Sequence, residues 1–181
     1  FVAWAKKNPT SMGTYAPGSY PHMVADQTNR QQGTKIQSVH YRGEAPMWLD
    51  VASGQLQIAV GSFQAFNAVS TRGVRAIGVT GSYRSPKLPD VPTLTEQGNT
   101  EKLVTLEGGL PLVAPAGTPE AVLKRMADEA VAWSNTERAA KLRETFAIPN
   151  KPKNLADTRK DWEGEVPVWI KLAVDLGIKL D

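Results

Sequence analysis

The stretch that decides the fold reads Gly13-Thr14-Tyr15-Ala16-Pro17-Gly18-Ser19-Tyr20-Pro21-His22. A short strand is predicted at its beginning, and its Gly and Pro residues predict a turn. A helix is predicted from Tyr20 or Pro21 to Gln32, because Ser19 is a suitable N-cap and Gly33 a suitable C-terminal stop. The stretch therefore predicts a strand, a tight turn and a helix start in direct succession.

The sequence that follows continues the alternation of strand and helix. Strands are predicted over 35–41, 57–60 and 74–80, with helices over 45–53 and 63–70 between them. Short turns that contain glycine join these segments. This order is typical of right-handed βαβ units, so we expect residues 1–98 to form an α/β domain with a mainly parallel sheet.

The pattern changes beyond a proline-rich arm over 83–98, for which we expect only a short helix over 93–97. The remaining residues, 99–181, predict one strand over 103–114 and three helices over 119–133, 136–145 and 155–176. These helices carry apolar faces with one strand to cover them, and such faces need a partner. The second domain is therefore predicted to be incomplete, and either missing chain or a homodimer would cover it.

Composition excludes several classes of protein. The 181 residues contain no cysteine, which rules out disulfides and thiolate chemistry. The net charge is +3, but Lys and Arg are scattered, so we expect no nucleic-acid partner. No apolar run approaches the roughly 20 residues of a membrane span. The chain opens on Phe1 without the pattern of a signal peptide.

Enzyme motifs are also missing. His22 and His40 are the only imidazoles, and they lack the His-Glu-x-x-His spacing of a zinc site. Ser19, His22 and Asp26 have the residue types of a catalytic triad, but their arrangement argues against one. Ser19 and His22 lie at the same helix start, and no Gly-x-Ser-x-Gly turn is present. We expect no catalysis, no metal and no cofactor.

Six segments, in order and in register, resemble the Bug-type receptors of the tripartite tricarboxylate transporter family: 13–22, 39–46, 54–60, 75–80, 84–93 and 114–119. The resemblance implies a periplasmic-binding-protein-like α/β fold with two hinged lobes. It implies that residues 1–98 form the second lobe and that residues 99–181 return into the first, whose N-terminal part has no counterpart here. It also implies a periplasmic location, a small carboxylate ligand and membrane transporter subunits or a sensor as partners.

The first candidate for ligand binding is the turn Ala16 to Tyr20. A helix start leaves main-chain N–H groups unpaired and carries a partial positive charge, so it binds a carboxylate without Lys or Arg. Gly18 permits close approach, Ser19 adds a hydroxyl, and His22 lies in the first helical turn. The alternative is an ordinary turn and cap; the resemblance favours the ligand site.

Two further candidates follow the next strands. Tyr41, Gly43 and Ala45 offer a hydroxyl and main-chain amides at the end of a strand, where open α/β sheets place ligands. Ser62 and Phe63 follow the strand after that, and Phe63 is suited either to an apolar ligand body or to the core. Ordinary packing is an equal alternative for Tyr41 and the stronger one for Phe63.

Gly61 bears on the choice of ligand. The resembled receptors often have an acid at the position of Gly61, and glycine carries no charge there. We therefore expect a dicarboxylate or an aromatic acid without an amine. The main alternative function is a truncated relative that acts as a non-ligand interaction or dimerisation module, and a hydrolase ranks third.

Overall fold

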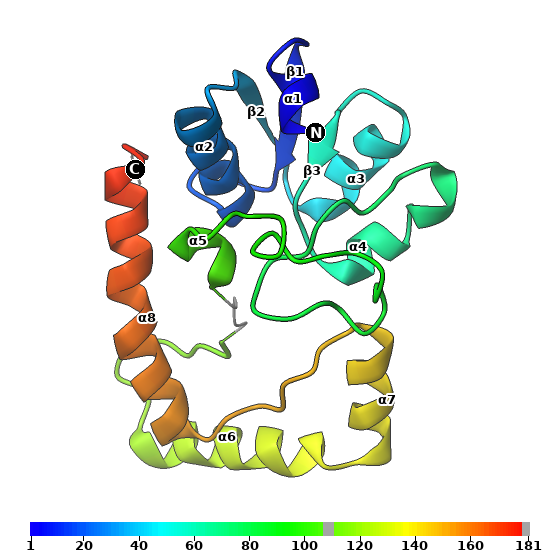
Figure 1. The fold of residues 1–181 in the computed structure, drawn as a ribbon. Helices are drawn as coiled ribbons and strands as arrows, with labels where there is room; N and C mark the ends of the chain where they lie inside the picture. The colour runs from blue at the N-terminus through cyan, green and yellow to red at the C-terminus, as the bar shows by residue number, and fades with distance from the viewer. Residues whose placement is uncertain (107–110, 179–181) are drawn as a thin grey trace. The chain divides into compact units, whose positions relative to one another are not determined.

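The computed structural model describes residues 1–106 and 111–178, and the chain divides into two compact units (Figure 1). Unit 1 comprises Phe1–Leu106 with Ile170–Asp181, and unit 2 comprises Glu107–Trp169. Unit 1 holds the sheet and its helices, and the described part of unit 2 holds helices without strands. The assignment of 1–98 and 99–181 to two receptor lobes stays a prediction.

The elements of unit 1 follow the predicted alternation. They are α1 (Val2–Ala5), β1 (Thr10–Thr14), α2 (Tyr20–Gln32), β2 (Ile36–His40), α3 (Glu44–Ala52), β3 (Ile58–Ala59), α4 (Phe63–Asn67), the 3-10 turn η1 (Ser70–Arg72) and α5 (Lys102–Thr105). Unit 2 contains α6 (Glu120–Ser134), α7 (Glu137–Thr145) and most of α8 (Leu155–Asp175), whose residues from Ile170 belong to unit 1.

The sheet has three parallel strands in the order β2-β1-β3, which confirms the predicted parallel sheet. Thr10 pairs with Ile36 and Thr14 with His40, and on the other side Met12 pairs with Ile58. Each strand is followed by a helix, and α2 and α3 lie on either side of the sheet (Figure 1). Because the strands are parallel, the segments that follow them emerge at one edge of the sheet.

One buried apolar cluster of unit 1 lies between α3 and the sheet. It consists of Met47, Trp48, Leu56 and Val69. Gly13 of β1 faces this cluster: a Cβ atom at Gly13 would lie 2.4 Å from Met47 Cγ and 2.7 Å from Leu56 Cδ1. Only glycine lets α3 pack this closely on the central strand.

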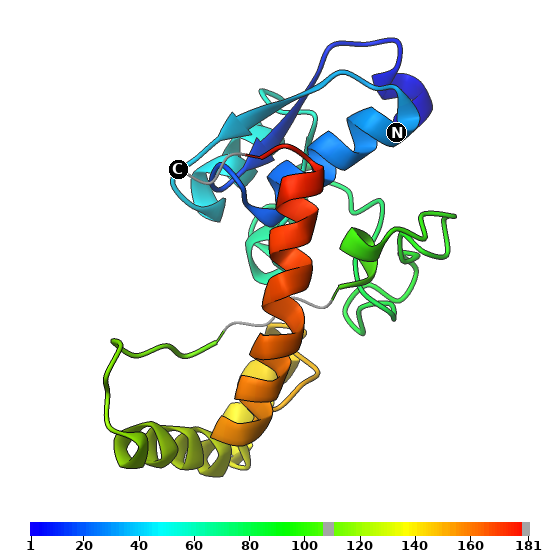
Figure 2. The same ribbon diagram turned by 90° about the vertical axis from the view of Figure 1, so that its left-hand side faces the viewer.

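On the opposite face, α2 anchors the end of α8. Arg30 donates to the main-chain oxygens of Asp175 (2.8 Å) and Leu176 (2.6 Å). These carbonyls lie at the C-terminal end of α8, where helical oxygens lack intrahelical partners and a cation is favourable. The last turn of α8 is thereby held beside α2 (Figure 2).

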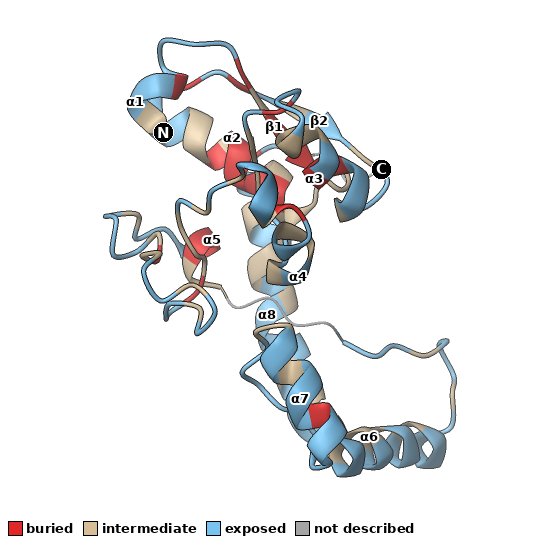
Figure 3. Cartoon of the chain, turned by 90° about the vertical axis from the view of Figure 1, so that its right-hand side faces the viewer, coloured by how far each residue is buried: buried red, intermediate tan, exposed pale blue. Residues whose placement is uncertain are grey.

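The helices of unit 2 have almost no core of their own. Among its described residues, 111–169, only Ser134 and Ala139 are buried (Figure 3). Large apolar side chains on all three helices are exposed, among them Met126 (40%), Trp133 (49%) and Trp162 (53%). The apolar faces predicted from the sequence are therefore uncovered.

Three predicted elements are wrong. Residues 74–80 form no strand but only a single parallel bridge of Val79 with Thr93, in which Val79 donates to Pro92 O and accepts from Leu94 N. Pro92 has no N–H with which to extend this pairing. Residues 93–97 form a turn instead of a helix. The predicted strand over 103–114 is helical in α5 and irregular over 111–114, while residues 107–110 lie outside the described part.

The close approach at Gly13 gives a first prediction. Gly13→Ala should lower the free energy of unfolding by about 1–3 kcal/mol, because the added methyl group overpacks the buried Met47 and Leu56. Urea unfolding followed by circular dichroism measures this change.

Gly164→Ala is the matched control. Gly164 lies inside α8, and an added Cβ meets nothing within 4 Å, so this variant should be more stable by about 0.5–1 kcal/mol. Equal effects of the two substitutions would contradict the packing described here.

Candidate functional site

Three turns meet at the carboxyl edge of the sheet: residues 15–19 after β1, 41–43 after β2 and 60–62 after β3. The main-chain N–H of Tyr41 donates to Thr14 O at 2.8 Å, so the first two turns begin directly beside each other. Neighbouring strands lie about 4.8 Å apart, which brings all three turns within reach of one small molecule. The three segments predicted to bind a ligand are therefore neighbours.

The first turn enters α2 as predicted, although the serine acts differently. Ser19 has extended backbone angles at the N-cap position, and Pro21 occupies the first helical turn. The Ser19 hydroxyl makes no cap hydrogen bond but donates to Ala16 O at 2.6 Å. Gly18 has a φ of 71°, a conformation that favours glycine. Ser19 thus closes the turn and leaves the start of α2 without a side-chain cap.

His22 folds back over this turn. Its Nδ1 accepts a hydrogen bond from the Gly18 main-chain N–H at 2.9 Å. One amide expected to meet a ligand is therefore paired with a side chain of the protein itself. The main-chain N–H of His22 has no acceptor among residues 1–106 and 111–178, so the helix start retains an unpaired donor.

A second imidazole, that of His40, packs against the His22 ring. The rings of His22 and His40 meet edge to face with their centroids 4.9 Å apart, and His40 Nδ1 lies 2.5 Å from Thr14 Oγ1. His22 Nε2 lies 3.7 Å from Asp26 Oδ2. Burial, and then the neighbouring His22, lower the pKa of His40 below its ordinary value.

Tyr20 points away from the turn. Its hydroxyl donates to Leu103 O of α5 at 3.2 Å, and burial raises its pKa to about 12. The Tyr20 side chain thus packs inside unit 1, and only its main chain belongs to the turn.

In the second turn, the predicted hydroxyl donor is already bound. Tyr41 donates to Asp50 Oδ2 of α3 at 2.6 Å, and this bond raises the Tyr41 pKa to about 12. Gly43 precedes α3 with a φ of 101°, and Ala45 is exposed in the first turn of that helix. The Tyr41 hydroxyl therefore anchors α3 instead of pointing to a ligand. Of the second turn, the main chain at Gly43 and Ala45 is what lies at the carboxyl edge of the sheet.

The third turn contains an interaction that the sequence analysis missed. Both the main-chain N–H of Ser62 (3.0 Å) and its hydroxyl (2.8 Å) donate to Glu44 Oε2. The only sequence signal was an acid directly after Gly43 at a helix start, which usually means a favourable helix dipole. Phe63 packs against Phe66, with ring centroids 6.4 Å apart.

Glu44 changes the interpretation of Gly61. A Cβ atom at Gly61 would lie 2.9 Å from Glu44 Oε2 and 3.0 Å from Trp48 Nε1. Glu44, from the neighbouring turn, therefore places a carboxylate beside Gly61. The expectation of a ligand without an amine stays a prediction, although its reason applied to residue 61 alone.

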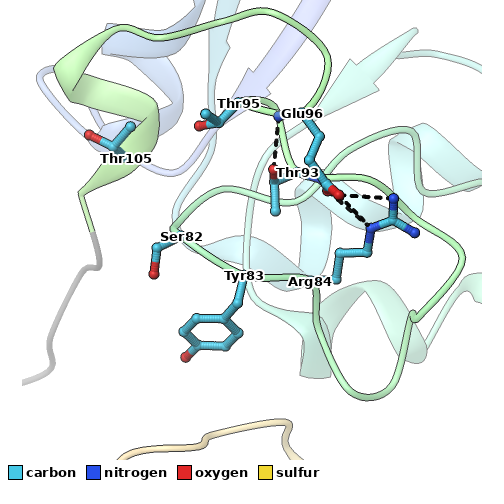
Figure 4. Close-up of a pocket in the computed structure, with 7 residues that line it drawn as sticks. All are labelled: Ser82, Tyr83, Arg84, Thr93, Thr95, Glu96 and Thr105. Carbon is cyan, nitrogen blue, oxygen red and sulfur yellow. Dashed lines mark hydrogen bonds and ion pairs between the residues drawn. The ribbon is translucent and has the colours of Figure 1, made fainter.

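Two hollows lie outside the predicted residues of the first two turns. One, of about 390 Å³, is lined mainly by hydroxyl-bearing residues and an ion pair (Figure 4): Ser82, Tyr83, Arg84, Thr93, Thr95, Glu96 and Thr105. The other, of about 320 Å³, is lined in part by Phe63 and Phe66. Phe63 is thus a predicted site residue that lines one of these two hollows.

The ion pair in the first hollow has a structural role. Arg84 Nη2 lies 2.9 Å from Glu96 Oε1, and Arg84 Nη1 donates to Pro89 O at 3.1 Å. Thr93 and Glu96 form a reciprocal capping box, in which each main-chain N–H donates to the side chain of the other residue. The hydrogen bond from Arg84 is the largest of the causes that lower the pKa of Glu96 to about 2. Arg84 and Glu96 thus fold the proline-rich arm.

Within the described ranges, no three or more of the His, Asp and Glu side chains form a group that could hold a metal ion. Over the same residues, none of the helices combines the length and apolar character that crossing a membrane requires.

Comparison with known proteins agrees with this fold. The sequence model of a protein family, the tripartite tricarboxylate transporter family receptor, matches residues 1–154. The "UPF0065 protein in tcbD-tcbE intergenic region" of Pseudomonas sp. (strain P51) is 31% identical over 180 residues, which are 94% of this chain and 52% of that protein. The chain thus spans about half the length of this relative.

Solved structures give the same result. Rpa4515 of R. palustris, solved with adipate, is 27% identical and has a TM-score of 0.83; the match covers 98% of this chain and 60% of that one. The periplasmic binding protein BugD is 21% identical with a TM-score of 0.76, over 98% of this chain and 60% of that one, and shares the fold.

The Tyr41–Asp50 bond gives a second prediction. Tyr41→Phe should lower the free energy of unfolding by about 1 kcal/mol at pH 8. Because the folded pKa of Tyr41 lies above its ordinary value of 10, this contribution is complete below pH 10 and is lost as the pH rises toward about 12. Urea unfolding of both proteins from pH 8 to 12 should show the difference shrinking. A difference that stays constant would contradict the bond.

Proposed function

The chain belongs to the tripartite tricarboxylate transporter receptor family, and from that premise we propose that it captures a small carboxylate outside the cytoplasm. The ligand is a dicarboxylate or an aromatic acid, and the receptor presents it to membrane transporter subunits or to a sensor. The role is binding, without catalysis.

The start of α2 carries this proposal. It combines the unpaired N–H of His22 with the positive end of a 13-residue helix at the carboxyl edge of a parallel sheet. Gly18 adds an amide that a carboxylate reaches by displacing the His22 ring. An anion therefore binds here by main-chain donors alone.

The solved relatives support the ligand class and the location. Rpa4515 was solved with adipate, a dicarboxylate, and BugD is described as a periplasmic binding protein. Since this chain spans about half of the first relative, the ligand, the location and the partner of the whole protein are parts of the proposal.

One observation favours the alternative, an interaction module. Unit 2 exposes Val122 (46%), Met126 (40%) and Trp133 (49%) on α6. Such a face is suited to a second copy of the chain or to a complementing segment. Light scattering distinguishes a homodimer from a monomer. The hydrolase alternative has no support, because Ser19 donates to Ala16 O while His22 accepts from Gly18.

Ligand titration tests the proposed function. Succinate, adipate or benzoate should raise the melting temperature, because a ligand that binds only the folded state stabilises it. Gly18→Ala should weaken that binding at least about tenfold, since the φ of 71° is unfavourable for alanine and the turn must change its backbone angles to accept it.

Gly33→Ala is the matched control. Gly33 ends the same helix with a φ of 65°, and a Cβ atom there meets nothing within 4 Å. This variant should bear a similar backbone strain and bind the ligand normally. Equal loss of binding in both variants, or no melting shift with any carboxylate, would refute the proposal.

A further inference from the structure

We infer that Glu44 is a specificity-determining residue, which selects carboxylate ligands that also carry an ammonium group. The inference rests on the proposed function and narrows its ligand class to amino dicarboxylates. It follows from the position, the charge and the surroundings of one carboxylate at the edge of the sheet.

The position of Glu44 is fixed. It is the first residue of α3, and Ser62 holds its Oε2 through a main-chain N–H at 3.0 Å and a hydroxyl at 2.8 Å. The side chain thereby bridges the turns that follow β2 and β3. It is half-buried, so a ligand at the edge reaches it without unfolding either turn.

The charge of Glu44 is not balanced by a cation. Among residues 1–106 and 111–178, the ion pairs leave Glu44 without a Lys, Arg or His partner. Its Oε1 accepts no hydrogen bond within the same ranges. A partly buried carboxylate with only neutral donors is less stable than one with a cation, and a ligand ammonium supplies that cation.

The indole of Trp48 gives an independent indication. Trp48 is 7% exposed, and its Nε1–H has no acceptor in the described part of the chain. The Cβ position of Gly61 would lie 3.0 Å from this nitrogen and 2.9 Å from Glu44 Oε2. A buried, unpaired donor thus lies beside the Glu44 carboxylate, and a ligand that carries an ammonium next to an oxygen would complement both groups.

Tyr15 connects this place to the carboxylate turn. Burial, and then the negative charge of Glu44, raise the pKa of Tyr15. Tyr15 is the first residue of the turn that contains Gly18, so the charge of Glu44 reaches the segment that would hold the ligand carboxylate. One amino dicarboxylate can then place a carboxylate at the start of α2 and its ammonium near Glu44.

A purely structural role for Glu44 makes a different prediction. If Glu44 only orders Ser62, then glutamine, whose amide oxygen accepts the same hydrogen bonds, would preserve all binding properties. Glu44→Gln therefore removes the charge and keeps the contact. Glu101→Gln is the matched control, because the Glu101 side chain is exposed and makes no hydrogen bond or ion pair among the described residues.

Calorimetric titration with two matched pairs, glutamate against glutarate and aspartate against succinate, tests the inference. The 181-residue chain should bind the amino member of a pair at least about tenfold more tightly, about 1.4 kcal/mol. Glu44→Gln should abolish that preference with little effect on the plain diacid, and Glu101→Gln should retain it.

The outcomes separate the two proposals. A preference unchanged in Glu44→Gln, or no preference in the original chain, would overturn the role of Glu44 and leave carboxylate capture standing. No binding of any of the four acids would overturn the role of Glu44, and no binding of adipate or benzoate as well would overturn both proposals. If Glu44→Gln does not fold by circular dichroism, Glu44→Asp decides, because it keeps the charge: it should retain the preference for the amino member, and loss of that preference would refute the inference.

Discussion

Parallel pairing of β1 with both neighbours is the constraint on which the rest of this structure depends. It sends the three following turns to one edge of the sheet, although they are separated by long stretches of sequence. Gly13 makes the pairing compatible with a tight core, because it lets α3 pack directly on the central strand. The same edge receives the positive end of α2, so fold and binding chemistry have one origin.

The polar groups at this edge are partly paired with one another. Gly18 donates to His22, Tyr41 to Asp50, and Ser62 to Glu44. Such contacts lower the cost of leaving these donors without a ligand. They also mean that a ligand must offer a better partner than the protein's own side chain. A full negative charge at the start of α2 meets that requirement, because a carboxylate accepts more strongly than a neutral imidazole.

The sequence predicted local features well and distant contacts poorly. Caps and stops such as Pro21 and Gly33 act within a few residues, so α2 was predicted to within one residue. The predicted strand over 74–80 is wrong because its pairing with the proline-rich arm stops at one bridge, where Pro92 has no N–H to continue it. Glu44 escaped notice since its bond to Ser62 spans 18 residues and depends on strand order. Nothing in the sequence around Tyr41 indicated that its hydroxyl binds Asp50, nine residues further along the chain.

The central claim, that main-chain amides at the start of α2 bind the carboxylate, is tested most directly by amide NMR during titration with a dicarboxylate. The largest chemical-shift changes should fall on the Gly18 and His22 amides, while the Gly33 amide at the far end of α2 stays unchanged. Saturation of the protein with the Gly18 and His22 resonances unmoved would contradict it, above all if residues 93–96 shifted instead.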